Sequence, residues 1–477
     1  MHMKRKIGLE VEYPMVCSDT LTGLPQDRIR RIWASLGKDG WSVSSDPVNG
    51  LATGAFRQNV AVDGCLNPNQ SISTDTGPLL EIAPSPEVSL AALKQQFSKL
   101  KELALQQVKS VGGMLLGLGV HPYTGDTKEE YYRLRTPRSA YDYAIKSRGW
   151  PHEKLLNVAA IQEVIDVPAE ESFRAFRVLI RLCGLMMFIF RNAPDLHHSS
   201  GYLCIRPKKW LDSVSSPIAR FRSDIQKVNI PLSEILNWQG YFDLLWNTSP
   251  MFLLGTKKHG LFYVPDHPTF WKFLTNVPAR GWTGVDVLGK EIAVMPDMDH
   301  VNCTDWTYFG FCRPRWKFGQ EVALAELIEA FRLGRMDSFF EKNATKIVIE
   351  NRCNATGFPG EEFCSLAFVL GILENLDTAE HLAFQYDYDF WRSMFSSAQI
   401  EPLRRTEIST RKVLPLAEKL LSIALDGLSA RGLGEENFLG PVAAIISSGV
   451  SRSELALKAL NSAADKKSVI RSMFAVD

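Results

Sequence analysis

The stretch I-G-L-E-V-E-Y at residues 7–13 alternates apolar and acidic side chains near the start of the chain. In a β-strand successive side chains point to opposite faces, so the apolar side chains would share one face, and Glu10 and Glu12 the other. Two neighbouring carboxylates that lose hydration repel each other, so they require either open water or cations between them. Taken alone, the stretch is typical of an amphipathic strand with a solvated outer face.

A second acidic stretch, S-T-D-T-G-P-L-L-E-I-A-P, occupies residues 73–84. Asp75 and Glu81 are an even number of residues apart, so a strand that is regular throughout would place both on one face. The Gly77-Pro78 pair between them interrupts such a strand. The pattern therefore predicts a shared face only if the strand passes this pair unbroken.

A third stretch, K-I-V-I-E-N-R at residues 346–352, has the same parity. Glu350 and Arg352 would lie together, opposite the two isoleucines. Three short strands that each point acidic groups one way predict a sheet with a charged concave face. Such a face is costly unless Mg²⁺, which binds carboxylate oxygens and substrate phosphates, offsets the charge.

Together these stretches resemble the glutamate–cysteine ligases, ATP-dependent enzymes that join the γ-carboxylate of glutamate to an amine, and their carboxylate–amine ligase relatives. G-L-E-V-E-Y resembles the first metal-binding strand of that family, T-D-x-x-P-L-L-E-I-x-P-x-P the second, and I-E-N-R the late E-x-R strand. The resemblance runs in order from residue 7 to about residue 460. It implies an α+β fold of the glutamine synthetase-like kind, in which helices surround a curved, mainly antiparallel sheet.

The resemblance also implies a set of ligands and residue roles. ATP and Mg²⁺ (or Mn²⁺) would be the cofactors. The metal would be held by five carboxylates, those of Glu10, Glu12, Asp75, Glu81 and Glu350. The catalytic residues would be Glu350 and Arg352. The nucleotide would contact Gln162, Arg315, Lys317 and Arg352, and the acid substrate Arg206, Arg138 and Tyr141.

Two segments connect Gln162 and Arg206 to the family. Residues 157–168 predict a strand followed by a helix, and Gln162 fits the position where plant-type enzymes carry glutamine. Val164 departs from the family pattern, because relatives keep a polar side chain there. Residues 200–207, S-G-Y-L-C-I-R-P, resemble the loop and strand that present an arginine to the glutamate carboxylates.

Two further segments are rich in basic residues. Residues 131–141 resemble the arginine- and tyrosine-rich stretch before a helix near the substrate, although a solvated turn explains them equally well. Residues 308–317 resemble the stretch that supplies Arg315 and Lys317 to the triphosphate. A predicted helix from Gln320 to Asp337 separates this stretch from the E-x-R strand, which departs from the family.

Helical periodicity predicts an amphipathic helix from Ser89 to Val111, a buried helix over Val178–Phe190, and a mainly helical C-terminal part. We expect residues 1–375 to form the catalytic region. We expect residues 376–477 to pack on it rather than fold independently.

Composition excludes several classes of partner. A net charge of +1 predicts neither a nucleic-acid nor a membrane partner. Eight cysteines without a C-x-x-C pair predict reduced thiols in a cytoplasmic protein. The adjacent His197 and His198 would face opposite ways, so they do not predict a metal site. The chain enters the Glu10 strand directly, which predicts no signal peptide. We expect a monomer or homodimer that acts on small molecules.

The resemblance to the glutamate–cysteine ligases implies an ATP-dependent ligase. A carboxylate acylates amines poorly because oxide would have to leave, whereas ATP converts it into an acyl phosphate that an amine attacks. Glutamate and cysteine are the favoured substrates, giving γ-glutamylcysteine. The alternatives are a related ligase for another amino acid or amine, a phosphotransferase, and a non-catalytic paralogue of the same fold.

Overall fold

The computed structural model describes residues 4–58, 69–196, 200–250, 254–256, 260–302, 308 and 310–477. A sheet of nine strands forms its centre, in the order β12-β13-β7-β1-β5-β4-β3-β2, with β6 also paired to β1. The strands are β1 (Ile7–Cys17), β2 (Ser42–Ser45), β3 (Ala52–Arg57), β4 (Gln70–Thr74), β5 (Leu79–Ala83), β6 (Gly113–Leu115), β7 (Ala160–Asp166), β12 (Cys312–Phe318) and β13 (Ala344–Ala355). Neighbouring strands run antiparallel, so the predicted α+β class with a mainly antiparallel sheet is confirmed.

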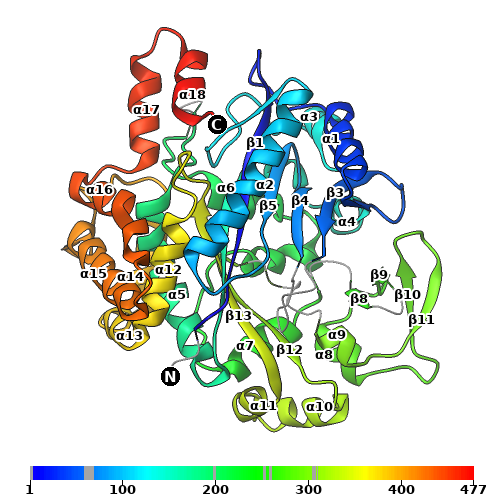
Figure 1. Cartoon of the computed structure of the whole chain (residues 1–477). Coiled ribbons are helices and arrows are strands. Elements are labelled where there is room, and N and C mark those ends of the chain that lie inside the picture. The colour runs from blue at the N-terminus through cyan, green and yellow to red at the C-terminus, as the bar shows by residue number, and fades with distance from the viewer. Residues whose placement is uncertain are drawn as a thin grey trace.

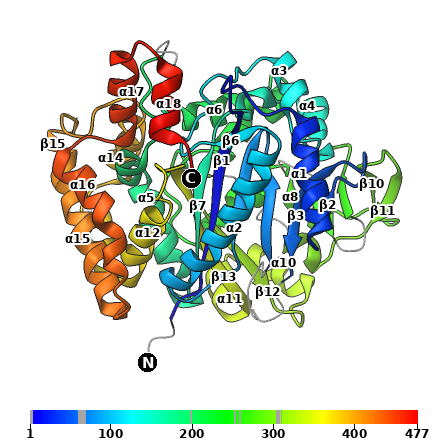
Figure 2. The ribbon, with the colours of Figure 1, turned by 45° about the horizontal axis from the view of Figure 1, so that its top comes forward.

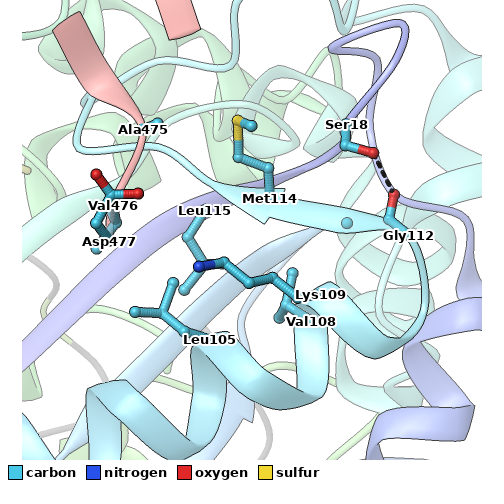
Figure 3. Close-up of a pocket in the computed structure, with 11 residues that line it drawn as sticks. Ser18, Leu105, Val108, Lys109, Gly112, Met114, Leu115, Ala475, Val476 and Asp477 are labelled. Carbon is cyan, nitrogen blue, oxygen red and sulfur yellow. Dashed lines mark hydrogen bonds between the residues drawn. The ribbon is translucent and has the colours of Figure 1, made fainter. Parts of the chain in front are cut away.

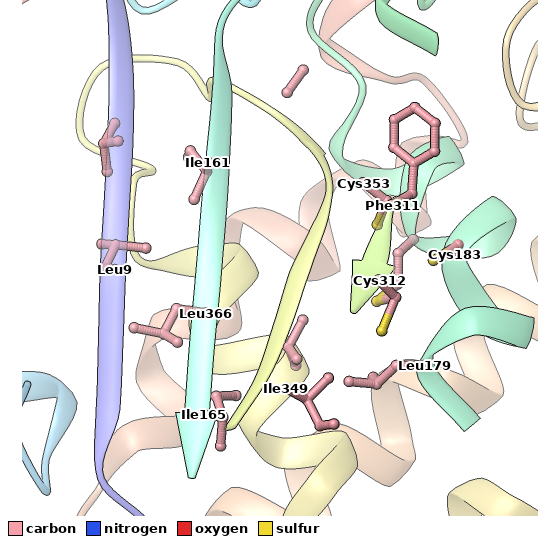
Figure 4. Packing of buried hydrophobic residues seen from close by; sticks show 14 of the residues in the cluster. Leu9, Ile161, Ile165, Leu179, Cys183, Phe311, Cys312, Ile349, Cys353 and Leu366 are labelled. Carbon is pink, nitrogen blue, oxygen red and sulfur yellow. The ribbon is translucent and has the colours of Figure 1, made fainter. Parts of the chain in front are cut away.

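Strand β1 lies in the middle of the sheet because three strands pair with it: β5, β6 and β7. Its alternating apolar residues point to one side, which we call the back face, and its glutamates point to the front face. Helices α2 (Leu90–Ser110), α5 (Ala169–Phe190) and α12 (Cys364–Glu374) pack on the sheet. Figure 4 shows Leu9 and Ile165 near Leu366 of α12, and Ile349 near Leu179 of α5.

The remaining elements surround this sheet. A second sheet with the order β11-β10-β9-β8 lies on the side of the molecule away from the C-terminal helices (Figure 1, Figure 2). Its strands are β8 (Leu254–Thr256), β9 (Gly260–Tyr263), β10 (Trp282–Asp286) and β11 (Glu291–Val294). The other helices of the first 343 residues are α1 (Gln26–Lys38), α3 (Lys128–Leu134), α4 (Ser139–Arg148), α6 (Arg206–Ser213), α7 (Trp238–Trp246), α8 (Phe270–Thr275), α9 (Met298–Val301), α10 (Leu324–Arg332) and α11 (Met336–Asn343).

The C-terminal part is helical, as its periodicity predicts. It contains α13 (Leu376–Phe384), α14 (Tyr388–Ser397), α15 (Val413–Arg431), α16 (Gly440–Ser448), α17 (Arg452–Ser462) and α18 (Lys466–Phe474), with a short hairpin of β14 (Glu407–Ile408) and β15 (Arg411–Lys412). Two buried arginines join it to the preceding region. Arg431 contacts Glu374 at 2.5 Å and the carbonyl oxygen of Val88 at 2.7 Å, and Arg191, at the end of α5, contacts Glu454 at 3.0 Å.

The start of α17 provides a test of this attachment. Ser451 caps the helix in a capping box with Glu454 and also accepts a hydrogen bond from Arg191 Nε at 3.0 Å. We expect Ser451→Ala to lower the free energy of unfolding by about 1–2 kcal/mol, the range for a lost N-cap. The exposed Ser462→Ala is the control and should change it by less than about 0.5 kcal/mol in urea denaturation. Equal stability of the two variants would contradict the role of this cap.

The structure decides one conditional prediction and corrects two others. Asp75 lies in the connection between β4 and β5, because Gly77-Pro78 ends the regular strand before Leu79. The single helix predicted over 320–337 is two helices, α10 and α11, separated by a turn that contains Gly334 with φ of 68°. Residues 200–207 lead into α6 rather than a strand. The adjacent histidines at 197 and 198 lie outside the described residues.

The end of the chain packs beside β6. Val476 N donates to Leu115 O at 3.0 Å, and a cavity of about 230 Å³ lies between this segment and α2 (Figure 3). Its walls are mainly apolar, and it contains none of the predicted site residues. In the described part of the chain no helix is both long and apolar enough to cross a membrane. Six cysteines are buried and free, as predicted, and the other two lie outside the described residues.

Candidate active site

Strand register gathers acidic side chains on the front face of the main sheet. Glu10 pairs with Gln162 of β7, and Glu12 pairs with Glu81 of β5. Directly paired residues of antiparallel strands share a face, so these four side chains form one patch. Glu12 and Gln162 are buried, whereas Glu10 and Glu81 are partly exposed, which opens the patch to solvent on one side.

Glu12 is held by two hydrogen bonds that also fix Gln162. Its carboxylate accepts from Ala160 N at 2.8 Å and from Gln162 Nε2 at 2.9 Å. Burial, together with the charge of Asp75, raises the pKa of Glu12 to about 8. Burial and the charges of Glu10, Glu12 and Asp75 raise the pKa of Glu81 well above its usual value. The carboxylates of the patch therefore destabilise one another when they are ionised together.

Glu350 lies beside this patch in a cluster of arginines. Arg313 of β12 pairs with it across the strands and contacts both of its oxygens, at 2.6 and 3.2 Å. Arg352 contacts it at 2.6 Å, and Arg315 lies 3.9 Å away. Burial opposes the ionisation of Glu350, but these three cations outweigh it and hold the pKa of Glu350 below its usual range. The cluster carries a net positive charge next to the acidic patch.

Arg352 lies at an irregularity of β13. Asn351 pairs with Glu163 and Asn354 with Ile161, so Arg352 and Cys353 together face the single residue Gln162. The side chain of Arg352 donates to the oxygen of Gln162 as well as to Glu350. A β-bulge of this kind changes the face of the residues that follow it. Arg352 itself stays on the front face, at the boundary between the acidic patch and the arginines.

Asp75 lies in the loop between β4 and β5 and contacts helix α4 at the site. Tyr141 OH donates to Asp75 at 2.9 Å, and the ring of Tyr141 lies 4.7 Å from that of the buried His152. Arg138 donates to the main-chain oxygen of Thr74 at 2.7 Å. Burial opposes the charge of Arg138, but Tyr141, Asp75 and Glu81 raise its pKa. The predicted substrate residues Arg138 and Tyr141 therefore lie beside the predicted acid Asp75.

Arg206 and Lys317 differ from their predicted placement. Arg206 begins α6, is buried, and donates to the main-chain oxygen of Arg352 at 2.6 Å, so it supports the irregular part of β13. Lys317 shares the side of Arg313 and Arg315 but lies near the end of β12, where it is exposed and pairs in register with Lys346. It is the site residue that the structure separates most clearly from the cluster.

The donor set tests whether a divalent cation fits. Carboxylate oxygens are the ligands that Mg²⁺ prefers, and a cation would relieve the repulsion among Glu10, Glu12 and Glu81. As the side chains lie, however, no group of three His, Cys, Asp or Glu residues in the described ranges is close enough to hold a metal. Glu350 is engaged by arginines. The chemistry of Glu10, Glu12, Asp75 and Glu81 thus fits Mg²⁺, and the side chains would have to converge on binding.

Sequence reasoning missed Arg313 and His152. Arg313 has the same parity as Arg315, but its contact with Glu350 depends on the pairing of β12 with β13, which no local pattern predicts. His152 follows a proline in a short 3₁₀ helix and carried no motif. Its Nδ1 lies 2.9 Å from Tyr131 OH, and burial lowers its pKa to about 4, so it is a neutral partner in the wall around Asp75.

The residues define a protein whose antiparallel sheet carries interleaved carboxylates and arginines on one face. Residues 7–241 match the family model "Glutamate-cysteine ligase family 2 (GCS2)", a range that includes β1, β5, β7 and Arg206 but not β12 and β13. The predicted resemblance to this family is thereby confirmed, by a match that covers residues 7–241.

Several plant proteins are similar over most of the chain. Glutamate–cysteine ligase B, chloroplastic, of Oryza sativa subsp. japonica is 24% identical over 472 residues, which cover 94% of this chain and 77% of that protein. Glutamate–cysteine ligase, chloroplastic, of Medicago truncatula is 23% identical over 410 residues, covering 83% of this chain and 68% of that protein.

Solved structures give weaker likenesses. The glutamate–cysteine ligase of Francisella tularensis, in complex with AMP, has a TM-score of 0.45 and 10% identity, with 98% of this chain and 87% of that chain covered. The ligase PafA in complex with the prokaryotic ubiquitin-like protein Pup has a TM-score of 0.40 and 10% identity, with 96% and 68% covered.

Proposed function

We propose that this protein is an ATP-dependent carboxylate–amine ligase that activates the γ-carboxylate of glutamate as an acyl phosphate and joins it to cysteine. The observation that carries the proposal is the front face itself, where the acidic patch of Glu10, Glu12 and Glu81 meets the arginine cluster around Glu350. The match of residues 7–241 to glutamate-cysteine ligase family 2 supports it. We assign the fold to the glutamine synthetase-like kind on the same basis.

The two charge types suit the two parts of the reaction. Transfer of the γ-phosphoryl group spreads negative charge over its oxygens, and catalysis consists mainly of positioning and of neutralising that charge. We assign this work to Arg352, Arg313 and Arg315, which Glu350 holds in place. Lys317, exposed at the strand end, remains a predicted nucleotide contact and has the least support.

We assign the acidic patch to the metal. Mg²⁺ (or Mn²⁺) bound there would offset phosphate charge and orient the triphosphate. Glu10, Glu12, Asp75 and Glu81 would hold it, and Gln162 would fix Glu12 through its amide. Ligation by Glu350 stays a prediction, because its oxygens would first have to leave Arg313 or Arg352. The amine then attacks the acyl phosphate, and the protein supplies no covalent nucleophile.

Product identification tests the proposal. The purified protein is incubated with glutamate, ATP, Mg²⁺ and cysteine, and γ-glutamylcysteine and ADP are followed by mass. We expect both products, and no ADP when either amino acid is left out. ADP released with one substrate alone would indicate a phosphotransferase. Efficient turnover of another acid or amine, without γ-glutamylcysteine, would keep the ligase and refute cysteine.

Arg206 gives a separate prediction about the acid substrate. We expect Arg206→Ala to raise the KM for glutamate by more than about tenfold and that for ATP much less, because a guanidinium pairs with a carboxylate through two hydrogen bonds. Arg206→Lys should restore it only in part. Equal changes in both KM values would show that Arg206 acts through its bond to the Arg352 carbonyl oxygen instead.

A further inference from the structure

A carboxylate that the proposed reaction does not use lies directly behind the site. Glu163 follows Gln162 in β7, is 0% exposed, and points to the back face of the sheet. Its oxygens accept hydrogen bonds from the side-chain amides of Asn351 at 2.7 Å and Asn354 at 2.9 Å. Within the described part of the chain no cation forms an ion pair with Glu163.

Burying Glu163 in this way costs free energy of folding. A buried carboxylate without a cation loses hydration that hydrogen bonds replace only in part, so it is a costly group to place in a core. Burial accordingly raises the pKa of Glu163 to about 7. Apart from Ser365 of α12, which also lies against Glu163, the buried residues of α5 and α12 behind the sheet are mainly apolar (Figure 4), so the network is better explained by what it positions than by stability.

The two asparagines stand on either side of the bulge in β13. Asn351 precedes Arg352 and pairs with Glu163, whereas Asn354 pairs with Ile161. A regular strand would turn residues 351 and 354 to opposite faces, because they are an odd number apart. The extra residue of the bulge turns Asn354 to the back, and both amides then reach the same carboxylate. Arg352 is left on the front, against Glu350 and Gln162.

We propose that Glu163 is a positioning residue: with Asn351 and Asn354 it closes the bulge from behind and so holds Arg352 and Gln162 in place on the front face. The consequence for catalysis rests on the proposed function, whereas the clamp itself rests on geometry. A carboxylate suits this place because both of its oxygens accept. A glutamine offers one acceptor and one NH₂ group, which would face the NH₂ group of an asparagine.

The substitution Glu163→Gln tests this with the full chain, because shape is kept and only the donor pattern changes. We expect faster amide hydrogen exchange across residues 350–354. We also expect kcat to fall about 10- to 100-fold, with the KM for glutamate nearly unchanged, since small misplacement of a charge-stabilising group costs rate. Unchanged exchange together with unchanged turnover would overturn the proposal.

Exchanging donor and acceptor provides the matched control. In Glu163→Gln combined with Asn351→Asp, the new amide donates to the new carboxylate and still accepts from Asn354. We expect this double variant to recover most of the exchange protection and turnover, and Asn351→Asp alone to lose both. In an Arg352→Met background, Glu163→Gln should not lower turnover further. Two results together would overturn the proposal and reduce Glu163 to a stability role. The double variant would not recover turnover, and Glu163→Gln would lower turnover further in the Arg352→Met background.

The proposal remains testable if Glu163→Gln does not fold, and also if the wild-type protein has no ligase activity. If Glu163→Gln does not fold, Asn354→Ala, which removes one of the two amide donors, must show faster local hydrogen exchange and lower turnover. Wild-type behaviour of Asn354→Ala would overturn the proposal. If the wild-type protein turns over no acid with any amine, the proposed function fails, and the exchange measurements still decide the clamp.

Discussion

Glu350→Ala should lower kcat by at least ~10²-fold, the scale expected when a charge-stabilising arrangement is lost. Its carboxylate contacts Arg313 through two hydrogen bonds and Arg352 at 2.6 Å, so it both neutralises and aims these guanidinium groups. Without it the arginines repel one another and lose the alignment that a transferring phosphoryl group requires. The measurement is steady-state release of ADP with glutamate and cysteine.

A matched variant separates this effect from lost stability. Removal of one partner from a buried ion pair destabilises a fold by about 3–5 kcal/mol, so Glu350→Ala should also unfold at lower urea concentration. Glu234→Ala removes a carboxylate that likewise joins two arginines, Arg177 and Arg181, away from the front face. It should lose stability and keep kcat. If folded Glu350→Ala also keeps kcat, the arginine cluster has no part in catalysis.

Local parity predicted the part of the site that lies within single strands. Glu10 with Glu12, and Glu350 with Arg352, share a face because each pair belongs to one strand with a period of two. For Asp75 the condition was not met, because the chain turns at Gly77-Pro78 between β4 and β5, yet Asp75 still contacts Tyr141 at the same site. Short-range periodicity therefore predicted which sheet face the strand residues occupy, but not the path of the connection between β4 and β5 that carries Asp75.

Pairing between distant segments could not be predicted in this way. Arg313 reaches Glu350, 37 residues later, only through the register of β12 with β13. The bulge at Arg352 depends on β7, and with it the contact of Asn354 with Glu163. These contacts belong to the assembled sheet, where one residue of slippage would turn every side chain to the other face.

Turnover should require Mg²⁺ or Mn²⁺, and Glu12→Ala or Glu81→Ala should each lower kcat at least ~10²-fold. Glu12 and Glu81 are direct partners across β1 and β5, and their negative charges raise the cost of leaving the patch without a cation. A metal that binds the folded state also stabilises it, so Mg²⁺ should raise the melting temperature of the wild type in a concentration-dependent way. Both readouts are measured after removal of metal with EDTA.

Asp166→Asn is the control for these two variants. Asp166 lies on β7 four residues from Gln162, but it is held by Lys346, so its loss should leave both the Mg²⁺ requirement and the melting response intact. Glu12→Ala and Glu81→Ala should lose the melting response along with turnover, because the same oxygens would hold the ion in both measurements. Full turnover in EDTA, or a normal melting response in both alanine variants, would contradict metal binding at the acidic patch. Its buried carboxylates would then require another ligand.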